Sequence, residues 1–358
     1  MAINVTAWVG WFRTEQTPPL GQRVTRSERL GYMQRVAFRL PVSSQVVSAI
    51  DPTASISYLG PTGTFSEQAV TGEADLAKLD LRPYGTNVEV LLAAERGDVT
   101  YGFAAIENMI EGSVNATLDT LAFESDDLLI KREVVMNVNL NLLVLAGVSL
   151  SEITEVRSHP VALAQCRRYL PQQLAGVTIT TVGSTADAAR EVAENDLRTT
   201  AAIAPRRSAE VWGLEILAED IEDHPENQTR FVLVGRDGID PPSGHDKTSV
   251  LIYQREDAPG SLVGILHEFA ARSINLTRLE SRPTRKGLGD YCFLIDCEGH
   301  ISDEVLGEAL RNIHTKQGNV KFLGSYPSTY GTEEEKNTNR EAVSNADGWL
   351  SGIRAQIR

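Results

Sequence analysis

The chain has 358 residues, of which 42% are hydrophobic and 23% are charged, a balance typical of a globular protein with two or three domains. Its formal net charge of −14 argues against nucleic acid or an anionic membrane as the main partner, and no apolar run reaches the roughly 20 residues needed to cross a bilayer. The three cysteines form no CxxC pair, so we expect them to be reduced and the protein to be cytoplasmic.

The two ends of the chain differ in composition from the middle. Residues 1–50 carry six arginines against two acids. This bias is one mark of a transit peptide, but serine is not enriched as it is in such peptides. We therefore expect residues 1–54 to be a poorly ordered N-terminal extension, or to include residues upstream of a start at Met33. Residues 329–358 are polar and are expected to form a C-terminal tail.

Strand-like and helix-like segments alternate between residues 55 and 235. A helix is predicted over Asn87–Arg96, where Val88, Leu91 and Leu92 have helical spacing. Further helices are predicted over 162–170 and 186–193, and strands over 128–135 and 138–145. Two successive runs of this kind predict an α/β domain with two lobes and a cleft between them.

A second unit follows a polar stretch rich in Pro and Gly. Residues 236–247 have the composition of a linker. Residues 248–328 then give the order strand, helix, strand, strand, helix, strand. This βαββαβ order predicts a ferredoxin-like fold.

Polar side chains gather where a buried strand passes into a helix, in the segment GFAAIENMIEGSVNATLDTL from Gly102 to Leu121. In an open α/β sheet, ligands bind at the carboxyl ends of strands. The Asn108 amide can donate to a ligand oxygen there, and Glu107 could supply a proton if burial raises its pKa, or could only orient its neighbours. The alternative is a cluster that caps the helix, which would suit Ser113.

Seven motifs occur in a fixed order along the chain: YLGPTGTFSEQA (58–69), AIENMIEGSV (105–114), SHPVALAQC (158–166), STADAA (184–189), NQTRF (227–231), PGSLVGIL (259–266) and ESRP (280–283). Together they resemble the bacterial prephenate dehydratases, in which a catalytic domain precedes an ACT regulatory domain. The resemblance covers about Ser55 to Pro327 and departs from the family at Met109, usually Ser or Thr, and at Ser261, usually Ala. It implies a catalytic domain over 55–235 like the two-lobed type II periplasmic binding proteins, and an ACT domain over 248–328.

The resemblance implies that the chain converts prephenate to phenylpyruvate, CO2 and water in phenylalanine biosynthesis. Aromatisation drives this reaction, so neither a cofactor nor a metal is expected. Thr229 is the expected catalytic residue, with Glu107 and Asn108 beside it. The residues expected to contact the substrate are Thr62, Gly63, Thr64, Phe65, Ser113, Ser158, Gln165, Arg230 and Phe231.

The chemistry of two of these side chains leaves alternatives open. The Thr229 hydroxyl can donate to the departing oxygen, or it can simply bond the backbone at a strand edge. Arg230 can clamp a carboxylate through two hydrogen bonds. On a regular strand, however, Arg230 faces away from Thr229 and would then be a structural ion-pair partner.

The resemblance also implies feedback regulation by L-phenylalanine and assembly into a homodimer or homotetramer. The expected effector site comprises Gly260, Ser261, Leu262, Val263, Asn275, Leu276, Glu280, Ser281, Arg282 and Pro283. The linker begins a few residues after Thr229, so we expect strand 229–235 to connect the two sites. Two alternatives to prephenate dehydratase activity stay open. The chain could be an arogenate dehydratase with the same site, or a binding protein of the same fold that senses an amino acid without catalysis.

Overall fold

The computed structural model describes residues 50–254, 258–285, 290–316, 318–329, 348–349 and 352–356. Most of the predicted N-terminal extension and C-terminal tail therefore lies outside the described residues. Within the described part, no helix is both long and apolar enough to cross a membrane. Cys166, Cys292 and Cys297 are buried free thiols, as expected.

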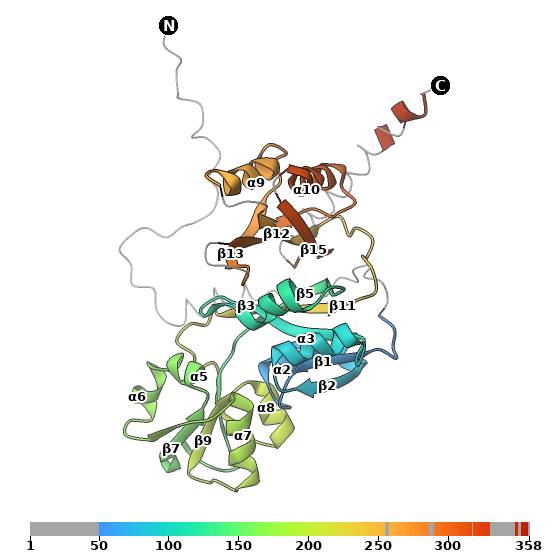
Figure 1. Ribbon diagram of the computed structural model, residues 1–358. Helices are drawn as coiled ribbons and strands as arrows, with labels where there is room; N and C mark the ends of the chain where they lie inside the picture. The colour runs from blue at the N-terminus through green and yellow to red at the C-terminus, as the bar shows by residue number, and fades with distance from the viewer. Residues whose placement is uncertain are drawn as a thin grey trace, which may run out of the picture. The chain divides into compact units, whose positions relative to one another are not determined.

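The first lobe of the predicted catalytic region is a sheet with helices packed on it. Its elements are β1 (Ser55–Leu59), α2 (Phe65–Gly72), η1 (Leu76–Lys78), β2 (Asp80–Tyr84), α3 (Asn87–Arg96), β3 (Tyr101–Asn108), β4 (Gly112–Ser113), α4 (Asn115–Asp119), η2 (Thr120–Glu124), β5 (Leu129–Asn137) and β11 (Gln228–Gly235). The sheet order is β2-β1-β3-β11-β5, with β4 paired to β3, and α2 and α3 lie beside β1 and β2 (Figure 1).

The second lobe repeats this plan. Its elements are β6 (Asn141–Val144), η3 (Leu150–Glu152), β7 (Glu155–Ser158), α5 (Pro160–Ala164), α6 (Tyr169–Gln173), β8 (Thr178–Thr181), α7 (Thr185–Glu194), β9 (Thr200–Ala204), α8 (Arg206–Trp212) and β10 (Glu215–Ala218). The sheet order is β10-β6-β9-β7-β8, and β7 is parallel to both β8 and β9.

Local sequence explains where the helices begin and end. Helix α3 has the predicted bounds, because the Thr86 hydroxyl caps its first turn by accepting from Glu89 N–H and Gly97 closes it at φ +77°. The single helix predicted over 162–170 was wrong, since the structure has the separate helices α5 and α6. Pro171 lies in the first turn of α6, where an N–H would have no partner within the helix, so its missing donor is tolerated there.

Two segments connect the lobes, one between β5 and β6 and the other between β10 and β11. They are hydrogen-bonded to each other, because Val138 N–H donates to the Asn227 carbonyl oxygen over 2.8 Å. The strand that enters each sheet from the other lobe, β6 or β11, lies inside that sheet and is antiparallel to both neighbours. This arrangement confirms the predicted two-lobed α/β fold.

The C-terminal unit has the predicted βαββαβ order. Its elements are β12 (Asp246–Gln254), α9 (Ser261–Ala270), β13 (Leu276–Pro283), β14 (Tyr291–Glu298), α10 (Glu304–Lys316) and β15 (Gly318–Pro327). The sheet order is β13-β14-β12-β15, and α9 and α10 lie on one of its faces (Figure 1). The ferredoxin-like fold is therefore confirmed.

The other face of this sheet packs on the first lobe. Leu251 and Leu294 belong to the same buried cluster as Leu121 and Ile130 of that lobe. The two backbones approach closely, because a Cβ atom on Gly324 would lie 2.4 Å from the Ile130 carbonyl oxygen. The C-terminal unit thus shares a hydrophobic core with the catalytic region, and this contact adds to the connection predicted through strand 229–235 and the linker.

Candidate functional site

Strands β3 and β11 bring four predicted site residues together. They run antiparallel, with Thr229 opposite Asn108 and Arg230 opposite Glu107. Neighbouring residues in a strand point to opposite faces of the sheet. The Thr229–Asn108 pair therefore lies on one face, and the Arg230–Glu107 pair lies on the other.

The side chain of Asn108 is held in one orientation. Its Oδ1 accepts hydrogen bonds from the backbone N–H groups of Ile110 and Glu111, both over 2.9 Å. The Nδ2 atom must then face Thr229, and it donates to the Thr229 Oγ1 over 2.9 Å. In this contact the Thr229 oxygen accepts, so its hydroxyl proton is still available to donate. Among the described residues, no group accepts a hydrogen bond from the Thr229 hydroxyl.

The second lobe contributes Gln165 to the same place. Asn227 accepts from Asn108 Nδ2 over 3.1 Å and donates through Nδ2 to Gln165 Oε1, also over 3.1 Å. The Nε2 of Gln165 is then the atom left for a ligand. We call Asn108, Gln165, Asn227 and Thr229 the junction cluster, because they lie where the two lobes meet.

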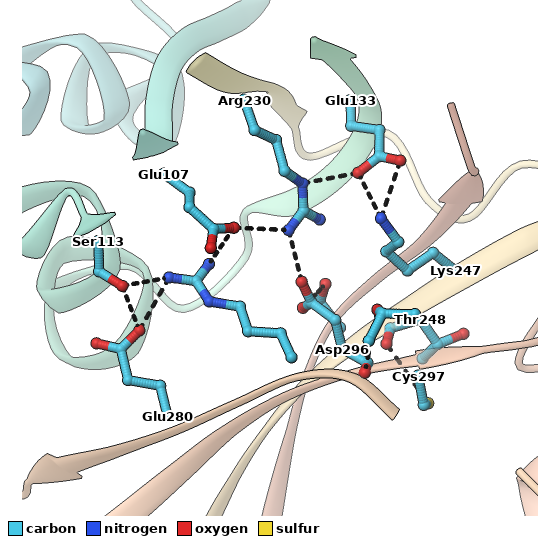
Figure 2. Close-up of polar contacts among 12 residues, drawn as sticks. Glu107, Ser113, Glu133, Arg230, Lys247, Thr248, Glu280, Asp296 and Cys297 are labelled. Carbon is cyan, nitrogen blue, oxygen red and sulfur yellow. Dashed lines mark hydrogen bonds and ion pairs between the residues drawn. The ribbon is translucent and has the colours of Figure 1, made fainter. Parts of the chain in front are cut away.

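Arg230 and Glu107 do not belong to the junction cluster. Arg230 is buried, with Nη1 2.6 Å from Asp296 and Nε 2.7 Å from Glu133 (Figure 2). Its Nη2 donates to the Tyr326 hydroxyl over 2.8 Å. These partners occupy its guanidinium, so the geometry supports the ion-pair reading of Arg230 and not the carboxylate clamp. Glu107 lies 3.8 Å from Arg230 and so faces the C-terminal sheet, away from Thr229.

Four charges form a buried charge cluster behind the junction cluster: Glu133, Arg230, Lys247 and Asp296 (Figure 2). Burial raises the pKa of both carboxyls. For Glu133, the positive charges of Arg230 and Lys247 lower the pKa by more than burial raises it. For Asp296, the charge of Arg230 and a hydrogen bond from Ser249 do the same. The pKa values of both carboxyls are therefore lowered. Burial and the neighbouring Arg230 lower the pKa of Lys247, against the pull of Glu133.

The predicted substrate turn over 62–65 meets the second lobe. The Gly63 carbonyl oxygen accepts from the Ser208 hydroxyl over 2.6 Å, and Phe65 packs against the apolar core of the second lobe. Gly63 has φ +95°, a left-handed conformation that favours glycine. The Thr62 side chain lies near the Tyr58 hydroxyl within the first lobe.

Glu67 and Arg207 were missed by the sequence analysis. Glu67 is buried on α2, accepts from the Gly63 N–H, and pairs with Arg207 of the second lobe over 2.9 Å. The Thr64 hydroxyl caps the same helix by accepting from Glu67 N–H. Glu67 lies inside the motif GTFSEQA, so the motif marked the region, but no sequence signal pointed to its partner 140 residues later. Asn227 was likewise inside NQTRF without an assigned role.

Three other expected substrate contacts lie away from the junction cluster. The Ser158 hydroxyl is completely buried and donates to the Ile203 carbonyl oxygen over 2.6 Å. Phe231 is buried in the first lobe and stacks on Phe103, with the ring centroids 5.2 Å apart. Ser113 donates to Glu280 of the C-terminal sheet over 2.6 Å (Figure 2). In this conformation, all three side chains serve packing or the domain interface.

The expected effector residues divide into two groups. The first surrounds the start of α9, where Gly260 is the N-cap at φ +87°, the Ser261 hydroxyl accepts from Gln254, Leu262 packs in the core and Val263 is 68% exposed. The second group is on or just before β13: Asn275, Leu276, Glu280, Ser281, Arg282 and Pro283.

The second group faces the catalytic region at two points. Glu280 accepts from Ser113, and Arg282 pairs with Asp119 and donates to Asn115. Arg278, which the sequence analysis did not single out, donates to Ser113 over 2.7 Å. Strand β13 therefore touches the segment that follows Asn108. No group of three His, Cys, Asp or Glu side chains in the described part of the chain could hold a metal ion.

Comparison with known proteins gives one consistent family. The family model described as prephenate dehydratase matches residues 56–239, and that of the ACT domain matches 248–315. A prephenate dehydratase of Mycobacterium leprae (strain Br4923) is 40% identical over 314 residues, covering 84% of this chain and 95% of that protein.

Two solved structures are similar along most of the chain. The crystal structure of prephenate dehydratase in complex with L-Phe from Arthrobacter aurescens has a TM-score of 0.73 at 36% identity and covers 84% of this chain and 99% of that one. The structure of GqqA, described as a novel type of quorum quenching acylases, has a TM-score of 0.69 at 29% identity and covers 77% and 98%.

Proposed function

The chain belongs to the prephenate dehydratase family and converts prephenate to phenylpyruvate, CO2 and water under phenylalanine regulation through its ACT domain, and we propose which of its residues perform these tasks. The GqqA structure shows that one fold is used for different activities. The fold alone therefore does not assign the residue roles, which depend on the side chains of the site.

Thr229 is the residue that assists the leaving hydroxyl. When the ring carboxylate of prephenate leaves as CO2, its bonding electrons enter the forming aromatic ring and expel the hydroxyl group. A donor aimed at the departing oxygen lowers the barrier, because charge grows on that oxygen. The single observation that supports Thr229 most strongly is that Asn108 donates to its oxygen, which leaves the hydroxyl proton for the substrate.

Gln165 is the proposed second donor. Its oxygen is bonded to Asn227, so Nε2 offers N–H groups to a substrate that carries two carboxylates. The backbone of the turn over 62–64 belongs to the proposed binding surface as well, because this turn contacts the second lobe at Ser208. Glu107 and Arg230 are left out of the substrate-contacting set, since their charges are turned toward the ACT domain.

Replacement of Thr229 by Val and by Ser tests the catalytic role. Val has the same shape without the hydroxyl, so Thr229→Val should lower kcat by roughly 10²-fold or more while KM changes little. Thr229→Ser keeps the hydroxyl and should retain most of the activity. Phenylpyruvate absorbance measures both constants, and a Val variant with near-native kcat would contradict the proposal. Arogenate assayed in parallel separates the two substrates of this chemistry.

Phenylalanine is proposed to bind at the start of α9 and along β13. The exposed backbone around Gly260 and the Ser261 hydroxyl suit an amino acid, and β13 lies at the edge of the ACT sheet. The signal then has a short path to the catalytic strands. Asp296 on β14 forms an ion pair with Arg230, which is next to Thr229 on β11. A shift of the ACT sheet would therefore move Arg230 and, through it, the strand that carries the Thr229 hydroxyl.

The protein is proposed to be a cytoplasmic homodimer or homotetramer. Within the described residues β13 pairs only with β14, so its outer edge is open to another strand. Leu279 on β13 is 45% exposed and would be covered by such pairing. Light scattering at micromolar concentration, with and without phenylalanine, should give at least twice the chain mass, and a monomer under both conditions would contradict the proposal.

A further inference from the structure

We infer that Asn227 is a positioning residue of this dehydratase, whose side-chain amide determines which atom of Gln165 faces the substrate. The inference rests on the proposed role of Gln165 as a substrate donor. Asn227 lies in the second segment that connects the lobes, and it is completely buried. Its side chain is the contact between the donor groups of the two lobes.

The orientation is passed along the junction cluster in one direction. Backbone N–H groups hold Asn108 Oδ1, so Asn108 must present its Nδ2 to Asn227. Asn227 must therefore present its acceptor atom, and its Oδ1 accepts from Asn108 Nδ2 over 3.1 Å. The oxygen and the nitrogen of a side-chain amide point in different directions, so Asn227 directs its Nδ2 toward Gln165. Gln165 must accept this hydrogen bond through its Oε1. Gln165 is thereby left with Nε2 outward, the polarity that an anionic substrate needs.

The backbone around Asn227 fixes the position of this contact as well. The Asn227 carbonyl oxygen accepts from Val138 N–H over 2.8 Å, which joins the two connecting segments. The Gln165 carbonyl oxygen accepts from Asp223 N–H over 2.6 Å, in the same connecting segment as Asn227. Gln165 is therefore tied to this segment by both its backbone and its side chain. Asn227 holds the donors of the two lobes at a set separation.

Two variants of Asn227 separate orientation from the effects of charge. Asn227→Leu has similar size and no charge, and it removes both hydrogen bonds. Asn227→Asp keeps the acceptor for Asn108 but replaces the donor by a second acceptor, so Gln165 must rotate and turn its oxygen toward the substrate. The matched control is Asn137→Asp, which adds the same charge near the same connection and keeps the acceptor used by Gln228 Nε2.

We expect KM for prephenate to rise roughly 10-fold or more in both Asn227 variants, because a hydrogen bond to a charged group is lost, while kcat stays within about threefold of the native value. The Thr229–Asn108 contact is retained, which is why kcat should change little. Asn137→Asp should leave both constants near native. A melt followed by circular dichroism shows whether each variant is folded at the assay temperature.

The pH dependence gives a second readout that a purely structural role would not produce. When the new carboxyl of Asn227→Asp is protonated, it has one acceptor and one donor, as Asn does. The ratio of its kcat/KM to that of the native enzyme should therefore increase as the pH falls, whereas the ratio for Asn227→Leu should stay constant.

Several results would overturn the inference. A native KM in Asn227→Leu with a raised KM in Asn227→Asp would mean that charge alone acts. A loss confined to kcat would place Asn227 in the chemical step. Gln165→Leu distinguishes the remaining failures: a native KM in this variant removes the proposed role of Gln165, and the inference with it. A raised KM there, together with native constants in both Asn227 variants, removes the inference alone.

Discussion

Replacing Asp296 by Asn should destabilise the protein by about 3 kcal/mol. Asp296 is 2% exposed and lies 2.6 Å from Arg230, in a buried charge cluster that contains two carboxylates and two cations. Asn keeps the shape but has only one acceptor oxygen. If that oxygen accepts from the Ser249 hydroxyl, the NH2 group faces Arg230, so both the negative charge and the hydrogen bond from Arg230 are lost. Removing one partner of a buried ion pair costs roughly 3–5 kcal/mol, because the other charge is left uncompensated. Glu133 still lies 2.7 Å from Arg230, which places this variant at the low end.

Lys247→Met is the matched control for this charge argument. Alone it leaves Glu133 and Asp296 against Arg230, so it should also be destabilising. The double variant Lys247→Met with Asp296→Asn keeps one carboxylate and one cation, so its charges balance again. Its free energy of unfolding should therefore be higher than the two single-variant losses added together predict, by roughly 1–3 kcal/mol. Guanidinium denaturation followed by circular dichroism measures all four proteins. Strictly additive costs would refute the reasoning.

The same Asp296→Asn variant tests the proposed path of regulation. Asp296 joins the ACT sheet to Arg230, so the variant should bind phenylalanine while losing part of the inhibition. Allosteric couplings are typically 1–3 kcal/mol, about 5- to 150-fold in affinity, so a loss of even half should be visible in the inhibition curve. Calorimetry measures binding, and the dehydratase assay measures inhibition. Native inhibition in a folded variant would restrict this cluster to stability.

Three further predictions concern the interface between the domains and the proposed effector site. The folded-state pKa values of Glu133 and Asp296 lie below their ordinary values of 4.5 and 3.8. The stability that these carboxylates contribute at neutral pH should therefore be lost as the pH falls below about 4.5 and through the folded-state pKa values. Urea denaturation at successive pH values should show a smaller decrease in the free energy of unfolding for Asp296→Asn than for the native protein. A chain cut after Lys247 exposes the shared core around Ile130 and should aggregate or melt at lower temperature than the full chain, as light scattering and circular dichroism would show; a stable, active fragment would contradict this. Ser261→Ala removes the acceptor of Gln254 and should change the phenylalanine concentration for half-inhibition by several-fold while leaving the uninhibited kcat unchanged, as inhibition curves would reveal.

Much of the fold could be predicted from the sequence, because local patterns determine it. Helix α3 has the predicted bounds, since its apolar spacing and its two caps all lie within a dozen residues. The βαββαβ order of the C-terminal unit follows in the same way from successive patterns. The single helix predicted over 162–170 was wrong, because apolar periodicity does not show where one short helix ends and the next begins.

The pairing of Thr229 with Asn108 was partly accessible from the sequence. Both residues lie near strand ends within recognisable motifs, so their common location could be expected. Alternation along a strand also predicted that Arg230 would face away from Thr229. It could not predict what Arg230 would meet, because Asp296 lies 66 residues later on a strand of another unit.

Only the tertiary structure decided which polar side chains belong to the candidate site and which to the interface between the domains. Glu107 and Ser113 are near Asn108 in the sequence, yet both point toward the ACT sheet. Asn227 and Gln165 are 62 residues apart and meet at the junction of the lobes. Local propensity determines helices, strands and the alternation of their faces, whereas the partner of each face depends on which distant strands pack against it, and that information is not local in the sequence.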